Sequence, residues 1–285
     1  MKRILLADAG STKVEWALIS QAGEIENTIV VSGLNALLAE QDEVKRAFIS
    51  VAQNFQGDQR IEEIHYYGAG CATQSICSKM ETALSDVWSD AECHVHSDLV
   101  GAARSLFGNR KGIACILGTG SNSCLYDGSG IISQIPSLGY ILGDEGSGAA
   151  LGRRLIGDAF KEQLPQNVKE AFLEEFHLTL EEILNRVYKS PSPNSFLASF
   201  VPFLKKNLWN PYVYSLVLRE LTRFVRRNVA MYPGAHSLEV SFTGSIAFHF
   251  DRILREAASS LGYCVSTVTE SPMPGLINYH KSNDK

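Results

Sequence analysis

Two short segments rich in glycine and hydroxyl residues, each lying between apolar strands, constrain the fold more than any other feature of the sequence. They are residues 8–12 (DAGST) and residues 118–121 (GTGS). Each follows one short apolar run and precedes another, which is typical of a hairpin turn. A third apolar segment follows in both places, at residues 25–31 and 130–135. The same strand–turn–strand–strand opening therefore occurs twice, about 110 residues apart, which indicates an internal duplication.

Further short strands and helical spacings complete each half. In the first half we expect strands at 64–67 and 93–96 and helices at 41–55, 74–88 and from Asp98 through Leu106. In the second half we expect a helical region at about 148–232 that is interrupted near its prolines, strands at 238–242 and 264–268, and a helix at 247–260. A β-β-β-α-β-α-β-α unit used twice predicts two layered α/β domains with mixed sheets.

The restart of the pattern sets the expected domain boundary. We expect a first domain at residues 1–110 and a second at 111–285, with the helical insert at about 148–232. The last residues of the chain are candidates for packing on the first domain.

Composition narrows the possible partners. The chain has 285 residues, and its 26 Lys and Arg against 31 Asp and Glu give a net charge of −5, which argues against nucleic acid as the main partner. The basic run Arg223, Arg226 and Arg227 fits a solvated helix face. The N-terminal apolar run is too short for a signal peptide and no stretch reaches the length of a membrane span, so we expect a cytosolic protein with no membrane partner.

The cysteines and histidines give no metal pattern. None of the six cysteines forms a C-x-x-C pair, and we expect buried thiols in a reducing compartment. His94 and His96 alternate on one predicted strand, where packing at the strand end is favoured over metal binding.

The two turns suit phosphate binding. Glycine lets backbone N–H groups point outward, and these groups together with Ser and Thr hydroxyls hold phosphate oxygens. For one such turn alone the ordinary hairpin is the favoured interpretation, because these residues dominate turns in general. Two turns at equivalent places in duplicated halves instead predict that both hold one polyphosphate.

Carboxylates stand beside these turns. Asp8 ends the first strand, where a carboxylate holds Mg²⁺ through water. Asp98 follows the last strand of the first half and opens a helix, so it is a candidate helix cap and a candidate general base that takes a proton from a sugar hydroxyl. Residues 143–148 (GDEGSG) place two acids among glycines just before a helix.

Together these motifs resemble a known family. Residues 8–13 (DAGSTK), 118–122 (GTGSN), 143–147 (GDEGS) and 243–245 (TGS) are similar to the BadF/BadG/BcrA/BcrD ATPase family, and within it to N-acetylglucosamine kinases. The resemblance spans nearly the whole chain. It implies two duplicated ribonuclease H-like (actin-like ATPase) domains and an ATP-dependent kinase that uses Mg²⁺ and phosphorylates an amino sugar. A homodimer is a reasonable expectation for such an enzyme.

The resemblance also implies roles for individual residues. Asp98 would be the catalytic base and Asp8 would be oriented toward Mg²⁺. The residues implied to bind ATP share glycines and hydroxyls: Gly10, Ser11, Thr12, Lys13, Thr119, Gly120, Gly244 and Ser245. The residues implied to bind the sugar come from both halves: Asn35, Asp98, Ser121, Asn122, Gly139 and Asp144.

One segment departs from the family pattern and leaves the sugar open. Kinases specific for amino sugars carry Gly-Trp-Gly ahead of the acidic loop, where this chain has Ser137, Leu138 and Gly139. N-acetylmuramic acid, glucosamine and another hexose are therefore alternatives to N-acetylglucosamine. Two other classes also compete. One is an ATP-driven activator of a 2-hydroxyacyl-CoA dehydratase type system with a cluster on Cys115 and Cys124, and the other is a non-catalytic sugar-sensing relative.

Overall fold

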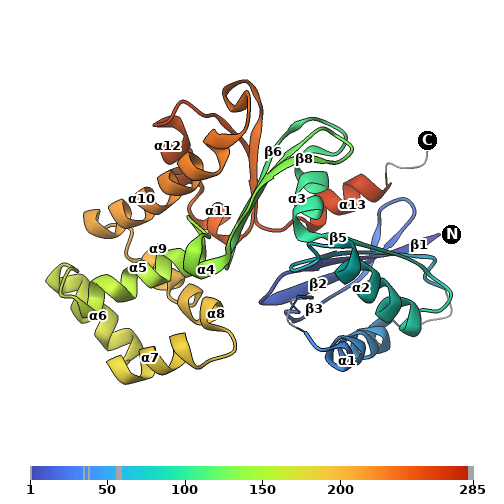
Figure 1. Ribbon diagram of the computed structural model, residues 1–285, viewed down its shortest axis with the longest axis horizontal. Helices are drawn as coiled ribbons and strands as arrows, with labels where there is room; N and C mark the ends of the chain where they lie inside the picture. The colour runs from blue at the N-terminus through green and yellow to red at the C-terminus, as the bar shows by residue number, and fades with distance from the viewer. Residues whose placement is uncertain (1, 35, 38, 56–59, 282–285) are drawn as a thin grey trace. The chain divides into compact units, whose positions relative to one another are not determined.

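The computed structural model describes residues 2–34, 36–37, 39–55 and 60–281. It divides into two compact units, the first formed by Met1–Arg110, Gly128–Gly130 and Ser271–Lys285 and the second by Lys111–Asp127 and Ile131–Glu270. Each unit has a five-stranded mixed sheet with helices packed on it (Figure 1). The fold class expected from the sequence, two α/β domains with mixed sheets, is confirmed.

The first unit contains β1 to β5, α1 to α3 and the last helix, α13. The strands are β1 (Arg3–Ala9), β2 (Lys13–Ser20), β3 (Ile25–Ser32), β4 (Glu63–Gly68) and β5 (Glu92–Ser97). The helices are α1 (Gln41–Ala52), η1 (Gln53–Phe55), α2 (Gln74–Val87), α3 (Asp98–Phe107) and α13 (Met273–Lys281). The strand order is β3-β2-β1-β4-β5, with β1 antiparallel to β2 and parallel to β4, and β4 parallel to β5.

Both faces of this sheet are covered, which explains the continuous apolar run in β1. Leu5 and Ala7 lie in the cluster that contains Phe48 of α1 and Leu84 of α2. The alternate residues of β1, Ile4 and Leu6, lie in a second cluster with Met273 and Leu276 of α13 and with Tyr67 of β4. Because side chains alternate along a strand, Asp8 lies on the same face as Ile4 and Leu6.

The second unit repeats the same topology. Its strands are β6 (Gly112–Leu117), β7 (Ser121–Tyr126), β8 (Ile131–Ile135), β9 (Val240–Thr243) and β10 (Val265–Thr269), in the order β10-β9-β6-β7-β8. Here β6 is central, antiparallel to β7 and parallel to β9, as β1 is to β2 and β4. The duplication of strand order therefore follows the duplication of turns in the sequence.

Most of the core of the second unit lies between its helices and one face of its sheet. The helices are α4 (Gly139–Leu142), α5 (Gly148–Phe160), α6 (Gln166–Phe176), α7 (Leu180–Tyr188), α8 (Pro193–Ala198), α9 (Val201–Lys206), α10 (Pro211–Arg227), η2 (Val229–Met231), η3 (Ala235–Ser237), α11 (Ser245–His249) and α12 (Asp251–Ser259). The expected interruptions are confirmed: Pro165 precedes α6, and Pro193 and Pro211 each occupy the first position of a helix, where a missing N–H costs nothing. The single helix expected at 247–260 is wrong, because the chain breaks at Phe250 into α11 and α12.

Within the described ranges, no helix combines the length and the apolar character that crossing a membrane requires.

Candidate functional site

The carboxylates predicted for Mg²⁺ binding and for catalysis, Asp8 and Asp98, lie at one edge of the first sheet. Parallel pairing aligns Ala9 of β1 with Gly68 of β4, and Gly68 with Ser97 of β5. Asp8 comes one residue before this line and Asp98 one residue after it. The carboxyl ends of parallel strands are where sites assemble in α/β sheets. The chain thus brings Asp8 and Asp98 to the same edge, although 90 residues separate them in sequence.

The sequence made Asp98 a candidate for the N-cap of α3, but the N-cap is its neighbour Ser97. Ser97 is the N-cap of α3, and its hydroxyl accepts a hydrogen bond from the N–H of Val100 over 3.3 Å. Asp98 is the first residue of the helix and one carboxylate oxygen accepts the N–H of Leu99 over 2.9 Å. Because Ser97 satisfies the cap, the Asp98 carboxylate is not required for that purpose.

Burial raises the pKa of both carboxyl groups. For Asp98 the loss of hydration raises the pKa to about 6, against the opposing effect of its hydrogen bond from Leu99. For Asp8 burial raises the pKa to about 7, and the negative charges of Asp98 and Glu15 add to the rise while Lys13 lowers it. A cation near Asp8 would offset both the burial and these charges.

The turn at residues 10–13, the first of the two turns predicted to bind phosphate, depends on a glycine for which the sequence predicted no role in it. The N–H of Gly33, just past β3, donates to the carbonyl of Thr12 over 3.0 Å. A Cβ on Gly33 would lie 2.4 Å from the backbone of Ser11 and Thr12, so only glycine fits. Gly10 is less constrained, with 3.3 Å between a Cβ and the carbonyl of Lys13. Ser11, Thr12 and Lys13 are exposed at the tip of this turn.

The second predicted phosphate loop, at residues 118–121, is hydrogen-bonded to the start of α5. The N–H of Gly148 donates to the carbonyl of Gly118 over 2.8 Å, and the N–H of Ala149 donates to that of Thr119 over 3.1 Å. The hydroxyl of Ser147 caps α5 by accepting from the N–H of Ala150 over 3.1 Å. The loop after β6 and the acidic loop before α5 therefore form one hydrogen-bonded structure.

Asp144 joins the same structure from the acidic loop. Its Oδ1 accepts the N–H of Ser121 over 3.4 Å, and its Oδ2 would lie 3.1 Å from a Cβ on Gly120. Its backbone has φ of 55°, in the left-handed region, which is uncommon for residues other than glycine although aspartate is among those that adopt it more often. Burial raises its pKa to about 6, the Ser121 hydrogen bond lowers it, and the charges of Glu145 and Arg153 act in opposite directions. Three of the residues predicted for phosphate or sugar, Gly120, Ser121 and Asp144, thus lie together.

The remaining predicted sugar residues are more dispersed. Asn122 points to the other face of β7, and its Oδ1 accepts from Gln134 of β8 over 3.1 Å and from the N–H of Ser123 over 2.9 Å. Gly139 begins α4, has φ of 71° and is exposed. Asn35 lies outside the described residues.

The predicted adenosine residues follow β9. Gly244 has φ of 111°, and a Cβ there would lie 2.4 Å from the carbonyl oxygen of Leu117. The N–H of Gly244 donates to Thr269 O over 3.0 Å, and Ser245, which is exposed, begins α11. The close approach places the end of β9 directly beside the end of β6, where the second phosphate loop begins.

The basic run on α10 is more than a solvated face. Arg227 Nε forms an ion pair with Oε1 of Glu145, and Arg223 pairs with Glu220 over 3.1 Å. Both glutamates are buried, whereas both arginines are more than half exposed. The contact of Arg227 with Glu145 could not be predicted from sequence, because 82 residues separate the two.

The cysteines lie as free thiols in the described residues. Cys115 and Cys124 are fully buried in β6 and β7, as the sequence analysis expected of its thiols, while Cys264 is exposed. His94 stacks on His65 of the neighbouring strand at 4.7 Å between ring centroids, and His96 stacks on Tyr67 at 5.5 Å.

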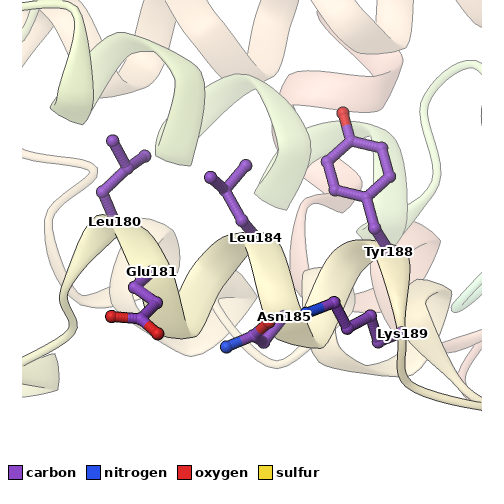
Figure 2. A pocket seen from close by; sticks show the side chains of 6 residues that line it. All are labelled: Leu180, Glu181, Leu184, Asn185, Tyr188 and Lys189. Carbon is purple, nitrogen blue, oxygen red and sulfur yellow. The ribbon is translucent and has the colours of Figure 1, made fainter.

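A surface groove lies elsewhere, along α7. Figure 2 shows its lining, which contains none of the predicted site residues: Leu180, Glu181, Leu184, Asn185, Tyr188 and Lys189. Leu180, Leu184 and Tyr188 form one row at four-residue spacing, and Glu181, Asn185 and Lys189 form a second row beside it.

Two duplicated units with this strand order, each with a glycine-rich loop after its central strand, define the fold of sugar kinases and actin-like ATPases. A solved structure from Porphyromonas gingivalis, provisionally named an N-acetylglucosamine kinase, is 42% identical to this chain, with a TM-score of 0.94 and 100% of each chain covered. The chain belongs to the sugar kinase family of that protein.

Other solved structures share the fold at low identity. A protein from Chromobacterium violaceum with the same provisional name is 15% identical, with a TM-score of 0.76 over 98% of this chain and 99% of that one. A ROK family glucokinase from Streptomyces griseus, solved with glucose and AMPPNP, is 13% identical, with a TM-score of 0.56 over 99% and 98%. No protein-family model and no curated protein matches the sequence.

Proposed function

We propose that this protein transfers the γ-phosphoryl group of ATP to a hydroxyl of an N-acetylated amino sugar, N-acetylglucosamine or a close relative. The observation that carries the proposal is the 42% identity, over the full length of both chains, to the Porphyromonas gingivalis protein. Motifs at residues 8–13, 118–122, 143–147 and 243–245 further support membership in the BadF/BadG/BcrA/BcrD family.

Asp98 is the proposed general base. It accepts the proton of the sugar hydroxyl while the new oxygen–phosphorus bond forms and the bond from the γ-phosphorus to ADP breaks. A pKa raised to about 6 by burial suits a base that works near neutral pH. The products are a sugar phosphate and ADP, and the proton remains on Asp98 until solvent takes it.

The two glycine-rich loops are the proposed phosphate ligands. Exposed Ser11, Thr12 and Lys13, together with Gly10, would bind the β- and γ-phosphates, and Thr119 and Gly120 would bind the same triphosphate. Gly244 and Ser245 are the residues proposed to approach the adenosine.

We propose that the carboxylate of Asp8 binds Mg²⁺ through a water molecule. Its surroundings fit a cation, because burial and the charges of Asp98 and Glu15 raise its pKa and a positive charge would relieve both. Among the described residues, no three His, Cys, Asp or Glu side chains form a group that could hold a metal. This suits Mg²⁺, which takes one or two carboxylates and completes its shell with phosphate oxygens and water. When bound, Mg²⁺ would neutralise phosphate charge.

The sugar would contact Asp98, Ser121, Asn122, Gly139 and Asp144, with Asn35 as a further candidate. Leu138 stands where related kinases have tryptophan and is exposed. N-acetylmuramic acid and glucosamine therefore remain alternative substrates to be tested.

The test is ADP release with ATP and Mg²⁺ across N-acetylglucosamine, N-acetylmuramic acid, glucosamine, glucose and N-acetylmannosamine. We expect release above the sugar-free rate with one of the N-acetylated sugars and its loss in Asp98→Asn. If none of these sugars stimulated ADP release, the proposed sugar kinase activity would be ruled out.

The activator alternative has little support in the structure. Cys115 and Cys124, the pair that would hold its iron–sulfur cluster, are fully buried in the sheet of the second unit. Cysteines that share a cluster between subunits need access to the surface.

We also propose a cytosolic homodimer. The free cysteines among the described residues fit a reducing compartment.

The α7 groove is the proposed contact between two copies, because an antiparallel two-fold pairing brings each row of α7 onto itself. Leu184 would then meet Leu184 of the partner subunit, and Glu181 would meet Lys189 of the partner subunit. Figure 2 shows the six side chains on one copy of the helix, and in this pairing the acidic end of the second row would face the basic end of the same row in the other copy.

Charge exchange tests this dimer. In a sedimentation series over protein concentration, Glu181→Lys should weaken self-association, and the double variant Glu181→Lys with Lys189→Glu should restore it. Met231→Glu, which changes an exposed apolar residue of η2, is the control and should have no effect. A monomeric wild type, or failure of the double variant to restore association, would rule out α7 as the interface.

A further inference from the structure

Backbone hydrogen bonds fix both ends of the acidic loop at residues 143–148, but they do not by themselves direct the Asp144 side chain. Asp144 has a left-handed backbone, and its side chain accepts a single hydrogen bond, from the N–H of Ser121 over 3.4 Å. Its own N–H donates to the carbonyl of Ser137 over 3.1 Å, on the segment that precedes α4. A side chain at such a position keeps its direction only if its neighbours in the loop are fixed.

Helix α10 supplies that support at the next two residues. Gly146 has φ of 72°, and a Cβ there would lie 2.9 Å from Cβ of Phe224, so the loop backbone lies directly against the helix. Glu145 turns its carboxylate into the same contact, where only 8% of the residue remains exposed. Arg227, one turn after Phe224, holds that carboxylate through its Nε.

The ion pair between Arg227 and Glu145 keeps the Glu145 side chain buried against α10. A buried carboxylate without a partner is strongly unfavourable, so Glu145 stays in this orientation only while Arg227 neutralises it. Because Glu145 adjoins Asp144, the contact with α10 also fixes the backbone that aims the Asp144 side chain at Ser121.

We propose that Glu145 and Arg227 are positioning residues, which hold the Asp144 carboxylate in its sugar-binding orientation beside the second phosphate loop. The proposal rests on the proposed function, in which Asp144 binds the sugar. Neither Glu145 nor Arg227 needs to contact the substrate, and both act through Asp144.

The same arrangement sets the electrostatics of Asp144. Burial is the main cause of its raised pKa, the charge of Glu145 on the same loop raises it further, and Arg153 of α5 lowers it. On α10, Arg227 faces Glu145, and the Arg223 and Glu220 pair lies one turn earlier. Removing Arg227 leaves the Glu145 charge without its neutralising partner, whereas Glu145→Gln removes that charge.

Two variants that break the Glu145–Arg227 ion pair should therefore shift the pKa of Asp144 in opposite directions. Arg227→Met should raise the pKa of Asp144 and Glu145→Gln should lower it, and each should raise the KM for the sugar about tenfold, as the loss of an orienting partner commonly does. The KM for ATP should stay unchanged. Arg227→Lys, which keeps the charge, should restore most of the sugar affinity.

Arg223→Met is the matched control. It removes an ion pair of the same kind from the same helix, but its partner Glu220 is on α10 and not in the acidic loop. It should leave the pKa of Asp144 and both KM values unchanged.

The pKa is read in the substrate-free protein from the carboxyl ¹³C NMR titration of Asp144, assigned by the signal lost in Asp144→Asn. Shifts of the same sign in Arg227→Met and Glu145→Gln, or an equal shift in Arg223→Met, would overturn the positioning role. This titration needs no turnover, so failure of the kinase assignment, seen as no sugar-dependent ADP release by the wild type, is distinguished from failure of the positioning pair.

Discussion

The backbone N–H of Gly148 donates a 2.8 Å hydrogen bond to the carbonyl of Gly118, and this bond joins the first turn of α5 to the loop after β6. The neighbouring bond from Ala149 to Thr119 extends the junction. Because backbone groups make both bonds, this junction does not depend on side chains. A preorganised loop of this kind keeps its N–H donors directed before a ligand arrives.

Asp98→Asn should cut kcat by at least ~10²-fold, the usual scale for loss of a general base. The KM for the sugar should stay close to that of the wild type, because asparagine keeps the size and the acceptor that bonds the N–H of Leu99. Steady-state ADP release at varied sugar concentration measures both constants. Retention of most of the wild-type turnover would show that the base is another residue.

Gly33→Ala should distort the first phosphate turn. Its Cβ would lie 2.4 Å from the backbone of Ser11 and Thr12, so the turn must move. We expect a loss of about 1–3 kcal/mol in the free energy of unfolding, the usual cost of overpacking, and a higher KM for ATP. Urea unfolding and ATP kinetics measure the two effects. Gly130→Ala, with open space around its Cβ, is the control, and equal behaviour of the two variants would contradict the prediction.

Gly244→Ala should destabilise the second unit. Alanine at φ of 111° is strained by about 1–3 kcal/mol, and its Cβ would also approach the Leu117 carbonyl at 2.4 Å. The displaced end of β9 should weaken ATP binding more than sugar binding, because Gly244 is proposed to approach the adenosine. Calorimetric titration with a non-hydrolysable ATP analogue checks this. Gly157→Ala in α5 meets no atom within 4 Å and should be neutral or stabilising.

His280 of α13 and His65 of β4 should make the stability of the first unit sensitive to acid. His280 lies 4.0 Å from His65 between ring centroids and shares a 2.8 Å hydrogen bond with the hydroxyl of Tyr67. Burial, and then the neighbouring positive groups, lower the pKa of His65 to about 3 and also lower the pKa of His280. These rings stay neutral in the folded state while the unfolded chain binds protons below about pH 6.5, so their contribution to stability falls as pH falls through that value.

His280→Gln isolates this effect from the carboxylates. At pH 7 the variant should be less stable by about 1 kcal/mol, since it loses the Tyr67 hydrogen bond. The gap to the wild type should close as pH falls below 6.5, by up to about 1.4 kcal/mol per pH unit. Urea unfolding at pH 7, 6 and 5 measures the gap, with exposed His177→Asn as the control. A difference in the free energy of unfolding between wild type and variant that grows toward pH 5 would contradict the prediction.

Much of the fold was predictable because its causes are local. Alternating and continuous apolar runs marked the ten strands, and Pro165, Pro193 and Pro211 marked interruptions of the helical region. The break at Phe250 was missed because no glycine or proline stands there, and the apolar spacing continues across it. Asp98, the proposed general base, and Asp8, the proposed carboxylate for Mg²⁺, were likewise predicted from sequence, since the first directly follows a strand and the second lies near the end of one.

The sequence by itself determined the strands, the turns between them and the duplicated order, because each depends on residues close together in the chain. Only the tertiary structure decided that Gly33 packs on Ser11, that Gly244 packs on Leu117 and that Arg227 neutralises Glu145. These contacts join residues that are 22 or more positions apart, and their strength comes from close approach and burial. No local pattern of apolar and polar residues records which distant backbone or charge will lie beside a given side chain.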